Sequence, residues 1–227
     1  MIIILLMQTS LMAVEPLPQQ TAPPRIVSFN LGQTAYVIPH REWLLGPRIL
    51  GYGVFPHIEL HTVPVFDLLG SWNLFLKMNI LETPYGAISA LGGVAYIDIE
   101  ELTGIRDITY FKYILGGTIS VPVHDRIKIH LNADNSQFSK NLARVLDLKG
   151  FSFYEAFTNL RADAEWRYSE KRTIIVGSGW DFASRQLAIG GSHVWNVGLF
   201  SLELGFNARP MSDKFPLHPF LNFWVRF

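Results

Sequence analysis

From residue 26 onward, apolar and polar residues alternate along most of the chain, and no long stretch shows the 3.6-residue stripe of a helix. The clearest run is residues 160–168, in which Leu160 and Trp166 belong to one alternating set and Arg161 and Asp163 to the other. A strand places two such sets on opposite faces, whereas a helix mixes them around its circumference. The pattern therefore predicts strands that are apolar on one face and polar on the other.

Twelve segments of this kind, separated by turn residues, predict twelve strands. They span residues 26–38, 42–54, 58–68, 72–82, 87–99, 108–120, 126–133, 152–167, 172–180, 186–196, 199–208 and 218–227. Most of them exceed the roughly 9–11 residues that a tilted strand needs to cross a bilayer.

Two prolines fit this assignment poorly. Pro47 falls inside the second predicted strand and Pro64 inside the third. A proline removes a ladder hydrogen bond, and a closed sheet has no edge on which to place it. A bulge at Pro47 and a kink near the end of a shorter strand at Pro64 are the interpretations that keep both strands.

The composition points to a membrane protein without membrane-spanning helices. Hydrophobic residues make up 49% of the 227-residue chain and charged residues only 17%, against a usual charged share of about 25%. The longest uncharged run, residues 186–202, is shorter than the roughly 18 residues of a spanning helix and is broken by polar residues. A transmembrane β-barrel has this composition because its apolar residues occupy alternate positions.

Charge and cysteine content exclude several classes of protein. Lysine plus arginine and aspartate plus glutamate both number 19, so the net charge is zero, which argues against a nucleic-acid partner held by a broad basic field. The absence of cysteine excludes a disulfide scaffold, a thiolate metal site and a cysteine nucleophile. The expected protein needs no cofactor.

The N-terminus has the pattern of a targeting segment. Residues 1–13 are apolar with small residues toward the end, as in a secretory signal peptide, although no basic residue precedes Arg25. Residues 14–25 contain four prolines and are expected to form an extended periplasmic lead-in, because such a segment cannot enter a ladder. The predicted barrel domain is residues 26–227.

The last seven residues provide a resemblance to a known class. Leu221, Phe223, Val225 and Phe227 alternate with other residues, and the chain ends on phenylalanine. This pattern resembles the C-terminal β-signal of Gram-negative outer-membrane β-barrel proteins, a porin-like class. The resemblance implies a single up-and-down antiparallel barrel in the bacterial outer membrane. It also implies that these four residues are read by the barrel assembly machinery, a partner alongside the outer-membrane lipid.

Such a barrel has both termini on the periplasmic side, so its even-numbered connections are periplasmic and its odd-numbered ones extracellular. The former are all short, such as 83–86 and 197–198, and the latter include the longest, 134–151. Within that longest connection, residues 139–150 have a helical pattern with a capping serine and a final glycine. A helix folded into the barrel mouth and an ordinary surface loop are equally compatible with it.

In a barrel the polar face meets the lumen, because a charge on the lipid face costs about 2–4 kcal/mol at the midplane. The predicted lumen-lining residues are Glu59, Lys77, Lys112, Lys128, Arg161, Asp163, Glu165, Arg167, Glu203 and Arg226. In one interpretation they line a narrow aqueous path, and in the other they pair across the interior and fill it. Twelve strands lie between the filled eight-stranded barrels and the open porins of 16–18 strands.

The histidines give no metal or catalytic motif. His57 and His61 have the closest spacing but lie too far apart in a strand to share one ion. Ser192 and His193 are adjacent and must point to opposite faces, so a nucleophile–base pair would need residues from different strands. We therefore expect no metal site and name no catalytic residue.

Three functions remain open from the sequence. The first is a narrow porin-like channel for small polar or charged solutes, which follows from the mixed-charge lumen. The second is an outer-membrane enzyme acting on lipid or lipopolysaccharide, which requires a serine or acid to meet a histidine near the outer rim. The third is a structural or scaffolding barrel whose lumen is closed by paired charges.

Overall fold

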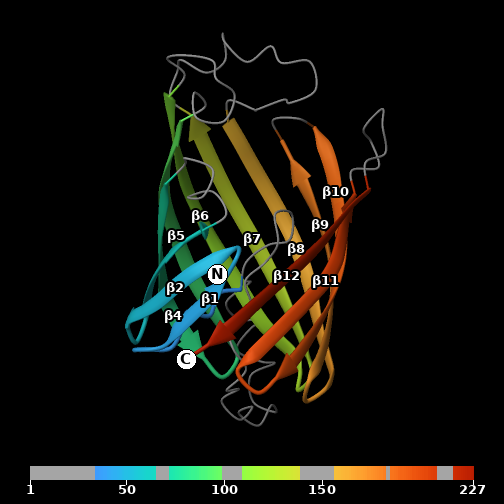
Figure 1. Ribbon diagram of the computed structural model, residues 1–227. Helices are drawn as coiled ribbons and strands as arrows, with labels where there is room; N and C mark the ends of the chain where they lie inside the picture. Colours follow the sequence, from blue (N-terminus) through green and yellow to red (C-terminus); the bar gives the residue numbers. More distant parts are fainter. Residues whose placement is uncertain (1–33, 65–71, 99–108, 139–155, 183–184, 209–216) are drawn as a thin grey trace, which may run out of the picture.

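A computed structural model describes residues 34–64, 72–98, 109–138, 156–182, 185–208 and 217–227. Twelve strands form one closed barrel (Figure 1). They are β1 (Trp43–Gly46), β2 (Ile49–Phe55), β3 (Ile58–Thr62), β4 (Asn73–Thr83), β5 (Gly86–Asp98), β6 (Thr109–His124), β7 (Ile127–Phe138), β8 (Ala156–Ser169), β9 (Arg172–Asp181), β10 (Gln186–Val197), β11 (Phe200–Ala208) and β12 (Leu217–Arg226). Among the described residues, no helix is long and apolar enough to cross a membrane.

The topology is the predicted one. Every strand pairs antiparallel with its neighbours in the chain, and β1 closes the barrel against β12 through Leu44 opposite Arg226 and Leu45 opposite Val225. Tight turns join β4 to β5, β6 to β7, β8 to β9 and β10 to β11 at one end of the barrel, which we call the short-turn end. Strand β12 also finishes at that end, shown at the bottom of Figure 1. The opposite end, into which the longer connections lead, is the long-loop end.

The alternation in the sequence corresponds to the two faces of the wall. In β8, Leu160 and Trp166 are 54% and 49% exposed on the outside, whereas Asp163 on the inside is 2% exposed. Leu160 pairs with Ala133 and Trp180, and Asp163 with His130 and Gly177, so each residue keeps its face across three strands. The predicted all-β, twelve-stranded barrel is confirmed.

The predicted first strand, residues 26–38, is wrong in the part that the structure describes. Residues 34–42 belong to no strand of the barrel, and residues 26–33 lie outside the described residues. The count of twelve survives because the predicted second strand, residues 42–54, is two strands, β1 and β2.

The two prolines that fitted the prediction poorly lie outside the strands. Pro47 is in the turn between β1 and β2, where its missing N–H breaks no ladder bond. Pro64 lies two residues beyond the end of β3 and interrupts no strand either.

Residues 34–42, which we call the interior segment, run through the barrel near the short-turn end. Ala35 and Ile38 are 0% and 1% exposed. The segment ends on β2, where the Arg41 amide donates to the Gly53 carbonyl (2.8 Å) and the Gly53 amide donates to the Glu42 carbonyl (3.1 Å). A Cβ at Gly53 would overlap the carbonyl oxygen of Pro39, so glycine is required for the approach of the two backbones.

An apolar cluster fills the interior beside this segment. Its members come from the interior segment and from five strands: Ile38, Leu44, Ile49, Ile175, Val194 and Trp224. Each of these side chains is less than 5% exposed. The barrel therefore has a small packed core where the interior segment meets β1, β2, β9, β10 and β12.

The outside of the barrel is apolar between two groups of aromatic residues. Trp43, Phe55, Tyr85, Trp166, Phe200 and Phe227 are exposed near the short-turn end. Trp72, Phe111, Tyr113 and Phe182 are exposed toward the long-loop end. An outward apolar band flanked by aromatic girdles is the surface of a membrane-embedded barrel, because the amphipathic rings prefer the two interfaces.

Replacing an outward residue between the girdles with arginine tests this embedding. Val176 lies in the middle of β9 and is 54% exposed. We expect Val176→Arg to lower the free energy of unfolding in lipid by about 2–4 kcal/mol, because the charge enters hydrocarbon. Val197→Arg, at the short-turn end of β10, is the matched control and should cost about 0–1 kcal/mol. Equal losses in denaturant titrations of the two variants would place Val176 in water.

Candidate functional site

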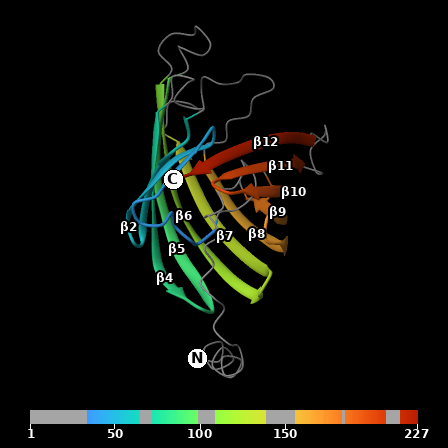
Figure 2. The same ribbon diagram turned by 60° about the horizontal axis from the view of Figure 1, so that its bottom comes forward.

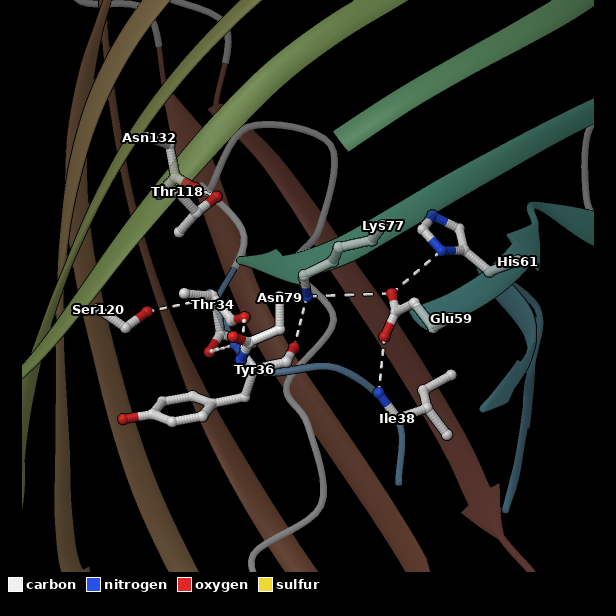
Figure 3. A network of polar contacts seen from close by, with 11 residues as sticks. Thr34, Tyr36, Ile38, Glu59, His61, Lys77, Asn79, Thr118, Ser120 and Asn132 are labelled. Atoms are coloured by element: carbon white, nitrogen blue, oxygen red, sulfur yellow. Dashed lines mark hydrogen bonds and ion pairs between the residues drawn. The ribbon is translucent and has the colours of Figure 1, made fainter. Parts of the chain in front are cut away.

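The interior segment is held by side chains that point inward from three strands (Figure 3). The Ala35 amide donates to Ser120 Oγ on β6 (2.8 Å), and the Ile38 amide donates to Glu59 Oε2 on β3 (2.7 Å). Lys77 Nζ on β4 donates to the Tyr36 carbonyl (2.5 Å). The wall thus supplies the backbone partners that a strand would find in a ladder, and the segment is fixed without being part of the sheet.

Glu59 and Lys77 are the charged centre of this contact. They are 3% and 4% exposed, and Glu59 Oε1 lies 3.9 Å from Lys77 Nζ and 3.2 Å from His61 Nδ1. Because both ions are buried and each also bonds the interior segment, removing the segment would leave two charges without part of their solvation shell. The pair and the segment therefore stabilise each other.

A second chain of polar contacts runs from the interior segment along β6, β7 and β8. Ser120 Oγ accepts from Ala35 and is 2.7 Å from His130 Nδ1, while His130 Nε2 is 3.3 Å from Glu165 Oε2. Because the Glu165 carboxylate can only accept, Nε2–H donates to it, and in a neutral ring Nδ1 then accepts from the Ser120 hydroxyl. Lys128, beside them, lies over the Tyr36 ring, with Nζ 4.6 Å from the ring centroid.

The serine, histidine and glutamate do not meet the condition set for an enzyme. They lie near the short-turn end and not at the outer rim, since Ser120 pairs with Ala87 at the start of β5. Ser120 is 0% exposed, and its oxygen already accepts a backbone amide. The arrangement holds the interior segment through the Ala35 amide.

The polar wall continues toward the long-loop end. Thr118 Oγ1 donates to Asn132 Oδ1 (2.7 Å), and Asn132 Nδ2 donates to Asp163 Oδ2 (3.4 Å). Further along, Lys112 lies within electrostatic range of Asp134 and Arg161. Acids, bases and amides therefore alternate on one wall, which gives a polar surface without a large field of one sign.

The opposite wall holds a smaller polar group. Glu203 on β11 is 0% exposed and accepts from Ser192 Oγ (2.6 Å) and Asn222 Nδ2 (3.5 Å). Arg226 at the end of β12 forms a two-pronged ion pair with Glu42, in which Nη2 donates to Oε1 (2.8 Å). Glu42 ends the interior segment, so this pair fixes the segment where it joins β1.

The ten charged residues expected in the lumen are all placed on strands. Glu59, Lys77, Asp163 and Glu203 are buried, and the other six, Lys112, Lys128, Arg161, Glu165, Arg167 and Arg226, are partly exposed. The structure brings Glu59 to Lys77 and groups Lys128, Glu165 and Arg167. It places Glu203 and Arg226 on other strands, away from these groups.

Sequence reasoning missed the interior segment and most of the neutral residues that hold it. Ser120 and Asn79, which bond the backbone of Ala35, are 0% and 5% exposed, but they carry no charge that would mark them in the sequence. Pro47 was the available signal. A proline in the middle of a predicted strand argues against that strand, and dividing the segment at Pro47 gives two strands, so that residues 26–38 are no longer needed to reach twelve.

Other expectations about single residues can also be placed. Ser192 and His193 do point to opposite faces: Ser192 bonds Glu203 inside, and His193 Nε2 lies 2.7 Å from the Tyr168 hydroxyl. Within the described ranges, no group of three His, Asp or Glu side chains is arranged to hold a metal ion. The predicted helix of residues 139–150 and the signal peptide lie outside the described residues.

No family model matches the sequence, and no curated protein matches it. A solved structure does match: "KdgM porin in complex with disordered oligogalacturonate", with a TM-score of 0.52 over 82% of this chain and 94% of that chain. The barrel has a porin-type fold. At 5% sequence identity, the similarity is one of backbone architecture and not of side chains.

In this porin-type barrel the interior is divided along its axis. Toward the long-loop end, the wall offers the polar side chains of β6, β7 and β8. Near the short-turn end, the interior segment lies among the inward side chains of the wall (Figure 3), and Ile38 joins it to the apolar cluster. The interior segment and the polar wall therefore lie along the same axis of the barrel.

Proposed function

We propose that this chain is a narrow outer-membrane channel for small polar or charged solutes, closed at rest by its own interior segment. The observation that supports the proposal most strongly is the set of inward polar side chains held against residues 34–42 by hydrogen bonds. The segment is held by side chains and not by a ladder, so its release would leave the sheet intact. A removable segment on a polar wall is suited to a gate.

The proposed orientation follows from the connections. Short turns lie on the periplasmic side of outer-membrane barrels and longer loops outside. The short-turn end is then periplasmic, and the interior segment closes the channel at its periplasmic half. Residues 1–13 as a signal peptide and residues 14–25 as a periplasmic lead-in agree with this orientation, and a Gram-negative outer membrane is the proposed location.

The proposed solutes are small and polar, of either charge sign. Lys112 and Arg161 share the outer half with Asp134 and Asp163, so no single sign dominates there. The similar solved structure is of a porin in complex with an oligogalacturonate, which makes short acidic saccharides the first solutes to test. We propose no catalytic role and no nucleic-acid partner.

Assembly of the proposed channel would use the C-terminal strand. Leu221, Phe223 and Phe227 are 62%, 42% and 60% exposed on the outer face, and Val225 lies between them in the same alternation. Their backbone pairs β12 with β11 on one side and, at Val225, with β1 on the other. Recognition of these side chains by the barrel assembly machinery, with release into outer-membrane lipid, remains a proposal.

Planar-bilayer recording of the refolded chain tests the channel directly. We expect brief, infrequent current steps from the intact protein, because the interior segment closes it. A variant in which Ile38→Asp places a carboxylate beside Glu59 and in the apolar cluster should show long openings. If neither protein, with barrel folding verified by heat-modifiable gel mobility, conducts above background, the chain is a closed structural barrel and the proposal fails.

A further inference from the structure

A polar pair lies on the outer surface of the barrel, near the short-turn end of β8 and β10. His193 on β10 faces outward, since it alternates with the inward Ser192 and Val194, which are 7% and 4% exposed. The Tyr168 hydroxyl, near the end of β8, lies 2.7 Å from His193 Nε2. The two side chains meet over β9, which separates β8 from β10 in the wall (Figure 2). Most of this outer face is apolar, and hydrocarbon offers no partner to such a pair.

Aromatic rings flank the pair on both sides. The centroid of the Trp166 ring lies 5.7 Å from that of Tyr168, and the centroid of the Trp195 ring lies 4.0 Å from that of His193. Trp166 is 49% exposed and belongs to the aromatic girdle of the short-turn end. Tyr168 comes two residues later in β8 and so lies closer to that end. The pair is therefore at the level where lipid headgroups meet water.

The pair has one hydrogen-bond donor more than its own bond uses. A histidine ring carries at least one N–H, and tyrosine carries one O–H. Whichever group donates in the bond between Tyr168 and His193, a donor of the other remains. Neither side chain has a second hydrogen bond among the described residues. An acceptor oxygen satisfies such a donor, and lipid headgroups supply phosphate and ester oxygens at this level of the membrane.

Arg172, the first residue of β9, adds an exposed positive charge beside the pair. It is opposite Trp195 in the ladder, two positions along β10 from His193. Diagonal neighbours of this kind on one face lie about 7–8 Å apart, within reach of a long side chain. Glu170 and Lys171 in the adjoining turn balance each other in charge, so Arg172 leaves this corner of the barrel net positive. A cation at a membrane surface attracts anionic lipid.

We propose that Tyr168, Arg172 and His193 bind the headgroup of an anionic phospholipid on the outer surface of the barrel. The Arg172 guanidinium pairs with the phosphodiester, and the remaining donor of the Tyr168–His193 pair donates to a phosphate or ester oxygen. An acyl chain then lies along the outward residues Ile174 and Val176 of β9, of which Val176 is 54% exposed. This apolar track favours a lipid over free phosphate. The site is outside the lumen, so the inference does not depend on conduction.

Native mass spectrometry of the full-length refolded chain tests this site. The protein is released from detergent micelles that contain equal amounts of phosphatidylglycerol, which is anionic, and phosphatidylcholine, which is zwitterionic. We expect one retained phosphatidylglycerol, at an occupancy at least about fivefold that of phosphatidylcholine. Arg172→Gln removes the charge and should lower this occupancy about fivefold. Tyr168→Phe combined with His193→Leu removes both donors and should lower it at least about twofold.

Arg185→Gln is the matched control, because Arg185 is also exposed but precedes β10 at the long-loop end, roughly 30 Å from Trp195 at about 3.3 Å per residue. It removes the same charge and should leave the retained lipid unchanged. Equal retention of the two lipids would overturn the proposal, as would an Arg172→Gln variant that loses no more than Arg185→Gln. Displacement of the lipid by excess inorganic phosphate would overturn it as well. None of these outcomes depends on current through the barrel, so they are separable from failure of the proposed channel.

Discussion

Replacing Gly53 with alanine is expected to raise the time-averaged ionic current through the barrel by about tenfold or more. The added Cβ would overlap the Pro39 carbonyl oxygen, which is backbone and cannot rotate away. The interior segment must then withdraw from β2, losing hydrogen bonds that contribute about 0.5–1.5 kcal/mol each. A shift of about 1.4 kcal/mol in the closed–open equilibrium already changes the open population tenfold. The measurement is planar-bilayer recording at equal protein insertion.

Gly92→Ala is the matched control for this prediction. Gly92 lies in β5, and a Cβ there would meet nothing within 4 Å. The variant should conduct like the wild type, which separates the effect of the clash from that of alanine in a strand. A correctly folded Gly53→Ala barrel with unchanged current would show that the interior segment is not the gate.

Replacing Lys77 with methionine should cost the largest amount of stability of any single change discussed. Lys77 is 4% exposed, faces Glu59 at 3.9 Å and donates to the Tyr36 carbonyl. Methionine keeps the approximate volume but leaves the Glu59 carboxylate buried without its cation. Breaking one side of a buried ion pair costs about 3–5 kcal/mol. Urea unfolding in lipid vesicles, followed by tryptophan fluorescence, gives the free energy.

Two further variants identify the cause of this loss. Lys77→Met combined with Glu59→Gln should recover a substantial part of the stability, because the uncompensated charge is removed. Lys171→Met, in the exposed turn between β8 and β9, should stay within about 0.5 kcal/mol of the wild type. A double variant no more stable than Lys77→Met would mean that packing, and not charge, explains the effect.

The sequence was sufficient to predict the barrel because its alternation reports directly on two solvents. Leu160 and Asp163 lie on opposite faces of β8, and only the face with Leu160 can meet hydrocarbon without burying a charge in it. The strand number was right only because two errors cancelled: the predicted strand at residues 26–38 is no strand in its described part, and the one at residues 42–54 is two. The short lengths of β1, β2 and β3 could not be predicted from the sequence, because its alternation continues past the ends of these strands.

The interior segment was mistaken for a strand because its surroundings are nearly uniform. Residues 34–38 are rich in residues that favour strands, yet Ala35, Val37 and Ile38 are all buried, so neither alternate set faces lipid. Its backbone bonds go to side chains such as Ser120 and Glu59. Sequence periodicity shows that a segment is extended, but it does not show whether its partners are backbone or side-chain groups.

The candidate site was predictable in its charges and not in its connections. Lys77 and Glu59 stand out because charged residues on alternating strands must avoid lipid. That Ser120 meets His130 depends on the register of β6 against β7, and a shift of one residue would place them on opposite faces. Neutral residues such as Asn79 carry no comparable signal in a sequence.

The most direct test of the closed barrel is the labelling rate of a single cysteine at Val37, a residue of the interior segment that is 9% exposed. A charged, membrane-impermeant thiol reagent is added to the refolded protein in vesicles, with His57→Cys in the exposed β2–β3 turn as the reference. A seated segment predicts labelling at least about tenfold slower at position 37, because reaction requires local opening. It also predicts that Gly53→Ala removes most of this protection. Equal rates at positions 37 and 57 in the otherwise unaltered barrel would contradict the account.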